Sequence, residues 1–130
     1  MDGVLYIGHG SRSKKGADEA KKFLEQIIEK VPVPIQEISF LELAAPSIEE
    51  GFKRCVMRGA TSIAVVPLFL LTTGHVKKDI PEIIKKLAGK YPEIKIDLKD
   101  ALGVQKPIID CMAKMVREIA GETNQDDVVL

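Results

Sequence analysis

The chain has 130 residues, which is enough for one domain with a buried core and too few for two. It carries 19 basic and 19 acidic residues, and this balance excludes the summed positive field that draws a protein to nucleic acid or to an anionic membrane. Aromatic residues make up 5% of the sequence and Trp is absent, which argues against platforms that stack bases.

Short apolar runs alternate with longer segments in which apolar residues recur at helical spacing, a pattern typical of repeated βα units. Residues 4–7 predict a buried strand, and residues 35–40 predict a second one. Ser47 and Glu50 have the spacing of a capping box ahead of a helix that Gly59 ends. Between the two strands, a helix is predicted whose inner face carries Phe23, Leu24, Ile27, Ile28 and Val31.

The third unit begins with a strand inside residues 62–71, with residues 63–66 as its core. Its helix is predicted to begin near Asp79 and to end at about Gly89. Pro81 then falls in the first turn, where a missing backbone N–H is tolerated.

The fourth unit begins with residues 95–98, where polar and apolar residues alternate as in a half-exposed strand near a sheet edge. The last helix is predicted to open around Pro107. It carries a series of apolar residues, namely Ile108, Ile109, Met112, Met115, Val116 and Ile119. We therefore expect one α/β domain over residues 1–120 with a mostly parallel, four-stranded sheet.

Residues 121–130 form a polar linker followed by the start of a further apolar strand, residues 127–130. A strand at a terminus has to join a sheet to be buried. It is either the beginning of a second half of a longer protein, or a short fifth strand or frayed tail.

Cys55 and Cys111 are too few and too far apart for a disulfide framework or a thiolate metal site, so a reducing, cytoplasmic setting is expected. The residue that follows Met1 is acidic, unlike the basic start of a secretory signal. The longest apolar run, residues 64–71, is far short of the ~20 residues that span a bilayer. No membrane association is expected.

The chemically distinctive residues follow the predicted strands, where an open parallel sheet forms its ligand crevice. His9 follows the first strand, Glu42 the second and His75 the third. Two imidazoles and a carboxylate are a common ligand set for a divalent metal, or a general-base pair. Alternatively, each histidine only forms a hydrogen bond within a tight turn. The neighbouring acids Glu37, Glu49 and Glu50 compete with Glu42 for the role.

Basic residues flank both histidines, namely Arg12, Lys14, Lys15, Lys77 and Lys78. Together they predict a positively charged opening suited to an anionic small molecule. Each lysine singly is equally well explained as a solvated residue at a helix start. The glycine-rich turn around His9 lacks the spacing of a phosphate-binding loop. Ser11 lies beside His9 but outside any G-x-S-x-G nucleophile motif, so a hydrolase is not favoured.

Residues 8–12 (GHGSR), 38–46 (ISFLELAAP) and 67–81 (PLFLLTTGHVKKDIP) together resemble the class II tetrapyrrole chelatases, and most of all the sirohydrochlorin chelatases that insert iron for siroheme or cobalt for cobalamin. The resemblance covers about the first hundred residues. It implies a chelatase-like, three-layer α/β/α fold of the flavodoxin-like kind and metal insertion without ATP.

For this chain, the resemblance implies that His9 and His75 hold the metal and that Glu42 is a further ligand, as in the iron-inserting branch. Iron is favoured over cobalt because the second block is most similar to that branch, and no cofactor beyond the substrate ion, Fe²⁺ or Co²⁺, is implied. The carboxylates of sirohydrochlorin are expected to meet Gly10, Ser11, Arg12, Thr73, Gly74 and Lys77.

Long members of the family have two similar halves, and in short members two chains pair, so a homodimer is also implied. One rival is a non-catalytic half that binds metal or tetrapyrrole and needs a partner half. A second rival is a flavodoxin-like FMN protein, for which the sequence offers no hydroxyl-rich phosphate loop.

Overall fold

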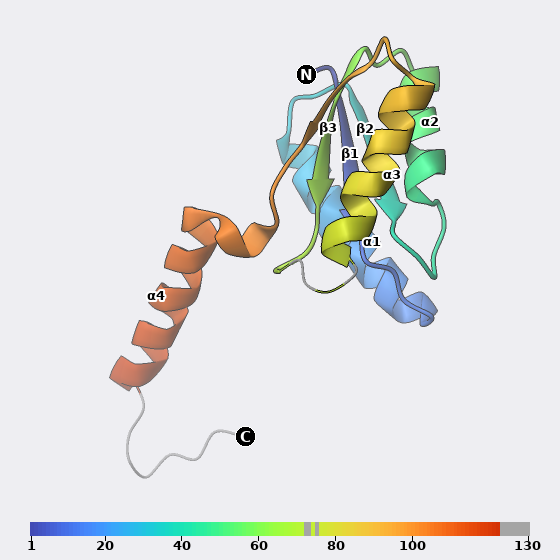
Figure 1. Cartoon of the computed structure of the whole chain (residues 1–130). Helices are drawn as coiled ribbons and strands as arrows, with labels where there is room; N and C mark the ends of the chain where they lie inside the picture. Colours follow the sequence, from blue (N-terminus) through green and yellow to red (C-terminus); the bar gives the residue numbers. More distant parts are fainter. Residues whose placement is uncertain (72–73, 75, 123–130) are drawn as a thin grey trace.

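A four-stranded parallel sheet forms the centre of the molecule, in the order β2-β1-β3-β4 (Figure 1). The computed structural model describes residues 1–71, 74 and 76–122. Its strands are β1 (Gly3–Gly8), β2 (Ile35–Phe40), β3 (Ser62–Pro67) and β4 (Lys95–Leu98). The expected α/β fold with a parallel sheet is confirmed, and the short fourth strand lies at a sheet edge as predicted.

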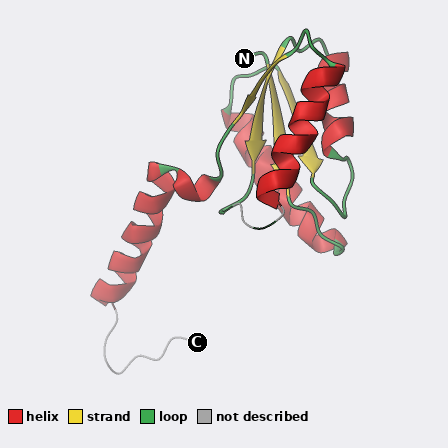
Figure 2. Cartoon of the chain, in the orientation of Figure 1, coloured by secondary structure: helices red, strands yellow, loops and turns green. Residues whose placement is uncertain are grey.

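Helices cover both faces of this sheet (Figure 2). They are α1 (Lys14–Lys30), α2 (Ile48–Met57) and α3 (Val76–Lys90); a short 3₁₀ helix, η1 (Leu102–Val104), then leads to α4 (Lys106–Glu122). None of the helices among the described residues combines the length and the apolar character needed to cross a membrane.

The core has two parts because successive residues of a strand point to opposite faces. Leu5 and Ile7 of β1 pack with α2 and α3, whereas Val4 and Tyr6 pack with Leu24 of α1. All of β1 is buried, as expected for the central strand of a parallel sheet that has helices on both faces.

The predicted end signals of α2 are confirmed. The Ser47 hydroxyl accepts a hydrogen bond from the Glu50 N–H at 3.1 Å and donates one to the Glu50 carboxylate at 3.1 Å. At the other end Gly59 has a φ of 100°, and its N–H donates to the carbonyl of Val56. A residue in this left-handed conformation closes the helix.

Two details of the prediction are wrong. Helix α3 begins at Val76 rather than near Asp79, which places Pro81 inside the helix and not in its first turn. Because proline has no N–H, the carbonyl of Lys77 lacks its usual partner within the helix. Phe23, expected on the inner face of α1, is 49% exposed, since it lies on the rim of the apolar arc whose centre is Leu24.

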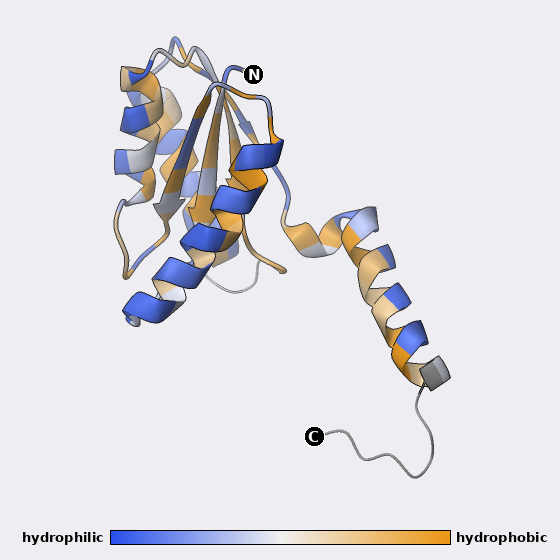
Figure 3. Ribbon diagram, turned by 180° about the vertical axis from the view of Figure 1, so that it is seen from behind, coloured by the Kyte–Doolittle hydropathy of each residue, from blue (hydrophilic) through white to orange (hydrophobic). Residues whose placement is uncertain are grey.

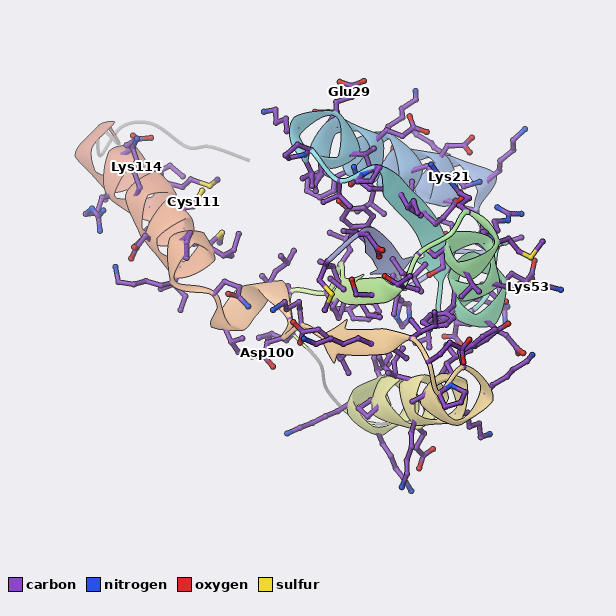
Figure 4. The ribbon with its side chains drawn as sticks, turned by 90° about the horizontal axis from the view of Figure 1, so that it is seen from above. Lys21, Glu29, Lys53, Asp100, Cys111 and Lys114 are labelled. Atoms are coloured by element: carbon purple, nitrogen blue, oxygen red, sulfur yellow. The ribbon has the colours of Figure 1, made fainter. Side chains whose placement is uncertain are left out.

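Helix α4 extends away from the sheet, as two views agree (Figures 1 and 4). In Figure 4 the labelled Cys111 and Lys114 mark its position, separated from the body by η1. No side chain of α4 belongs to either core cluster found among the described residues. Its apolar stripe is exposed: Ile109, Met112, Met115, Val116 and Ile119.

Asp2 ties the start of β1 to the start of β3. Its carboxylate accepts hydrogen bonds from the Thr61 hydroxyl at 2.7 Å, from the Thr61 N–H at 3.0 Å and from the Ser62 N–H at 2.9 Å. These bonds favour the charged form and hold the pKa of Asp2 well below its usual range, the Thr61 hydroxyl having the largest effect.

Because the pKa is lowered in the folded state, Asp2 stabilises the fold above the ordinary aspartate pKa of about 4, and this stabilisation is lost as the pH falls below it. The Asp2→Asn variant is therefore expected to unfold at lower urea than wild type at pH 7, with the difference narrowing below about pH 4. Urea unfolding followed by circular dichroism at several pH values measures this, with the exposed Asp18→Asn as control. A difference that stays constant down to pH 2 would contradict this role.

Candidate metal and substrate site

The loops that follow β1 and β2 are joined by backbone hydrogen bonds at the carboxyl edge of the sheet. The Leu41 N–H donates to the carbonyl of Gly8 at 2.9 Å, and the Glu42 N–H donates to the carbonyl of His9 at 3.2 Å. These bonds continue the strand pairing for two residues beyond its end. They fix His9 and Glu42 side by side, as the prediction from the strand ends required.

The side chains of His9 and Glu42 face each other. The distance from His9 Nε2 to Glu42 Oε1 is 3.6 Å, and the side chains are 51% and 49% exposed. An imidazole nitrogen and a carboxylate oxygen this close, and open to solvent, are two donors of the types that divalent first-row metals bind.

The third predicted ligand, His75, lies outside the described residues, as does Thr73. Among the residues that the structure describes, no group of three His, Cys, Asp or Glu side chains could hold a metal. His9 and Glu42 thus form a two-residue pair, and the role of His75 stays a prediction.

Gly10 lies against the loop that carries Glu42. Its φ is 106°, in the region that favours glycine, and a Cβ at this position would overlap the carbonyl oxygen of Glu42. The glycine is therefore required for the close approach of the two loops. The predicted role of Gly10 in substrate binding stays a prediction.

Ser11 acts as a structural residue. Its hydroxyl accepts a hydrogen bond from the Ser13 N–H at 3.1 Å, and the Ser13 hydroxyl caps α1 by accepting one from the Gly16 N–H at 3.3 Å. Arg12 lies between them and is exposed. Across the same edge of the sheet, Gly74 has a φ of 58° and is exposed.

The first turns of α1 and α3 carry lysines, although the positive end of a helix dipole disfavours cations. Lys14 and Lys15 open α1, whose first turn has no acidic residue, and Lys77 and Lys78 open α3, where Asp79 offsets one charge. Helix α2 has the ordinary arrangement, with two glutamates in its first turn. The two helices that begin nearest the histidine motifs therefore concentrate positive charge where an anion would relieve it.

Two hollows border this edge of the sheet. One, of about 260 Å³, lies between α3 and the end of β4 and is lined by Val76, Lys77, Ile80 and Leu98, among others. The other, of about 240 Å³, adjoins Glu42 and is lined by Leu41, Glu42, Asp79, Glu82, Ile83 and Lys86. The site thus has a basic side and an acidic side.

Two features of the site had not been predicted. Leu43 has a φ of 63°, an uncommon conformation for a bulky residue, directly after Glu42. Phe69 follows β3 and contacts the His9 imidazole, with ring centroids 5.7 Å apart and an angle of 79° between the ring planes. Neither feature has a signal in the sequence. The contact between Phe69 and His9 depends on how separate loops meet, and bulky residues such as Leu43 rarely adopt a positive φ.

Comparison with protein families gives one match to nearly the whole chain. The family model described as CbiX matches residues 3–119. A protein of Priestia megaterium named sirohydrochlorin ferrochelatase is 47% identical over 130 residues, which cover 100% of this chain and 49% of that protein.

Similar proteins differ in length. A Sulfolobus acidocaldarius protein named sirohydrochlorin cobaltochelatase is 35% identical, and the match covers 86% of this chain and 87% of that protein. A solved structure is also similar, that of the sirohydrochlorin chelatase SirB from Bacillus subtilis subspecies spizizenii in complex with cobalt. Its sequence is 49% identical and its TM-score is 0.80, and the match covers 91% of this chain and 50% of that one. The chain therefore spans about half the length of the Priestia and Bacillus proteins.

Proposed function

This chain belongs to the CbiX family of class II chelatases, and on that basis we propose that it inserts a divalent metal into sirohydrochlorin without ATP, with iron as the favoured ion and cobalt as the second. The observation that carries the proposal is the exposed pair of His9 and Glu42 at the carboxyl edge of the sheet, 3.6 Å apart.

The chemistry of insertion requires weak and exchangeable metal binding. The ion must lose water, two pyrrole N–H protons must leave, and the ion must pass into the macrocycle. Neutral imidazole can hold the ion and can also accept a pyrrole proton, because the same lone pair binds a metal or a proton. We propose that His9 and His75 hold the ion. As the ion passes to the nitrogens of the macrocycle and frees the imidazole lone pairs, they take up the two pyrrole protons, which then pass to solvent. A closed set of four protein ligands would retain the ion instead of releasing it.

Glu42 supplies the negative charge of the proposed site. A carboxylate beside His9 offsets part of the charge of M²⁺ while water is removed, and it is free to move because half of its surface is exposed. The acidic hollow next to Glu42 favours a cation on this side of the site.

The substrate carboxylates are assigned to the basic side. Arg12 and Lys77 are exposed next to the histidine motifs, at the helix starts whose lysines are unfavourable without an anion. Backbone N–H groups of the turns at Gly10, Ser11, Thr73 and Gly74 complete the proposed contacts.

The Glu42→Gln variant is expected to bind metal more weakly and to insert it about tenfold more slowly without becoming inactive, because the amide keeps an oxygen ligand and loses the charge. Initial rates over a range of Fe²⁺ concentrations measure this. Glu37→Gln is the matched control, since Glu37 lies on β2, the strand that precedes Glu42, and pairs with Arg58 away from the site. Wild-type kinetics in Glu42→Gln would remove Glu42 from the mechanism.

A non-catalytic half that only binds metal or tetrapyrrole is the second candidate. It is favoured by the exposed apolar stripe of α4, which a partner half would cover. The two functions separate when the protein, sirohydrochlorin and Fe²⁺ or Co²⁺ are mixed without oxygen and the absorption spectrum is followed. Conversion faster than the uncatalysed reaction supports the enzyme, and a stable spectrum of bound tetrapyrrole supports the carrier.

We further propose that two copies of the chain pair through α4. In Figure 3, hydrophilic and apolar residues alternate along this helix, which extends away from the sheet. Met112, Met115 and Val116 are 52%, 50% and 60% exposed and lie within one arc of the helix. An exposed stripe of this kind on a protein with a zero net charge favours self-association.

The Val116→Glu variant is expected to shift the chain from dimer to monomer, because the charge would be buried in the apolar contact. Light scattering at several protein concentrations measures the mass. Arg117→Gln, on the opposite side of α4, is the control and should leave the mass unchanged. A wild-type chain that is monomeric at every concentration and fully active would contradict the dimer.

We also propose that the protein works in the cytoplasm. A reducing compartment keeps iron in the ferrous state, and it keeps the thiols of Cys55 and Cys111 free rather than oxidised.

A further inference from the structure

Phe69 lies where the hydrophobic core meets the candidate metal site. Its side chain is 8% exposed and belongs to the core cluster formed with α2 and α3. It also contacts the His9 imidazole nearly edge to face, with ring centroids 5.7 Å apart and an angle of 79° between the planes. This is a preferred arrangement for two aromatic rings.

Among the residues that the structure describes, the other contacts of His9 leave its ring orientation open. The hydrogen bond from the Glu42 N–H reaches the His9 carbonyl and fixes only the backbone. The Nε2 to Oε1 distance of 3.6 Å is longer than a hydrogen bond, and the imidazole is 51% exposed. Of the side chains that the structure describes, Phe69 therefore limits rotation about the side-chain bonds of His9 the most.

Phe69 is itself held on two sides. The N–H of the preceding residue, Leu68, donates to the carbonyl of Ile7 at 2.7 Å, so this segment continues beside β1. The carbonyl of Phe69 accepts a hydrogen bond from the Leu102 N–H of η1 at 2.8 Å. These bonds fix the backbone at Phe69, and burial among the core side chains, with 8% of the residue exposed, holds its ring. A ring held in this way cannot follow the imidazole, so it sets the position of the imidazole.

We propose that Phe69 is a positioning residue that orients the imidazole of His9 for metal binding. The inference rests on the proposed function, because it takes His9 to be a metal ligand. Phe69 touches neither metal nor substrate in this role. It restricts the His9 ring before the ion binds, so that fewer ring orientations are lost on binding. Residues behind a metal ligand commonly act in this way.

The test compares Co²⁺ binding by the full chain and three variants, measured through the visible absorption of bound Co²⁺ well below each unfolding temperature. Phe69→Leu keeps an apolar side chain and removes the ring. Phe69→Tyr keeps the ring. Phe52→Leu is the matched control, because Phe52 is fully buried in the same cluster and its ring contacts that of Tyr91 rather than that of His9.

We expect Phe69→Leu to weaken Co²⁺ binding about tenfold and to alter the absorption bands. Phe69→Tyr and Phe52→Leu should stay within about twofold of wild type, the latter despite a lower unfolding temperature. Wild-type affinity in Phe69→Leu, a Phe69→Tyr as weak as Phe69→Leu, or an equal loss in Phe52→Leu would overturn the proposal. A wild-type chain that binds no Co²⁺ would overturn the metal site as well, which separates the two failures.

Discussion

Replacing His9 by alanine is expected to reduce metal insertion more than roughly 100-fold, since even the loss of a residue behind a metal ligand lowers affinity about 10–100-fold. The fold should survive, because His9 lies on a loop with half of its side chain exposed and contributes little buried surface. Initial rates of insertion and urea unfolding of the same preparation measure the two effects separately.

His75→Ala is the companion variant and is expected to behave in the same way. Lys53→Ala, on α2, is a suitable control for a substitution of similar size away from the site. Retained turnover in His9→Ala would remove this imidazole from the mechanism, and a large loss of stability in that variant would show that His9 is structural.

The second large effect is expected at Gly10. Gly10→Ala requires a side chain at a φ of 106° and an overlap with the carbonyl of Glu42, so the two loops must separate. A strained backbone position of this kind lowers the free energy of unfolding by roughly 1–3 kcal/mol. Because the separation also moves Glu42 away from His9, insertion should fall by at least about tenfold.

Gly89→Ala is the matched control for Gly10→Ala. Gly89 lies inside α3, and a Cβ there would meet no atom within 4 Å. Alanine at an open helical position stabilises by roughly 0.5–1 kcal/mol, so the two substitutions should shift stability in opposite directions. If Gly10→Ala retained wild-type stability and activity, the close approach of the two loops would not matter for the site.

The strands were predictable because a parallel sheet buries continuous apolar runs. Residues 4–7 and 63–66 have no polar member, and both fall within central strands, whereas the alternating residues 95–98 form the edge. Local capping chemistry fixed the limits of α2 in the same direct way, through Ser47 and Gly59.

The start of α3 was not predictable from local rules. Proline is expected in a first turn, yet Pro81 lies inside a helix whose buried residues Ile80, Ile84 and Leu87 pack on the sheet. Tertiary burial of this face outweighs the hydrogen bond lost at the proline. The position of α4 relative to the sheet could not be predicted either, because an amphipathic pattern predicts a helix but not the surface that its apolar side contacts.

At the site, the sequence located residues that directly follow strands and missed those that act through packing. His9 and Glu42 could be placed together because parallel strands end at one edge. Phe69 resembles any other apolar residue until the fold brings its ring to His9. The left-handed conformation of Leu43 likewise could not be predicted, because bulky residues rarely adopt it.

X-ray absorption spectroscopy of the Co²⁺-loaded chain tests most directly the claim that the metal is held at this edge of the sheet by His9. The fine structure should contain imidazole scattering in wild type, with one imidazole fewer in His9→Ala. Identical spectra for the two proteins, or a spectrum of cobalt bound by water and carboxylate oxygens alone, would contradict the account.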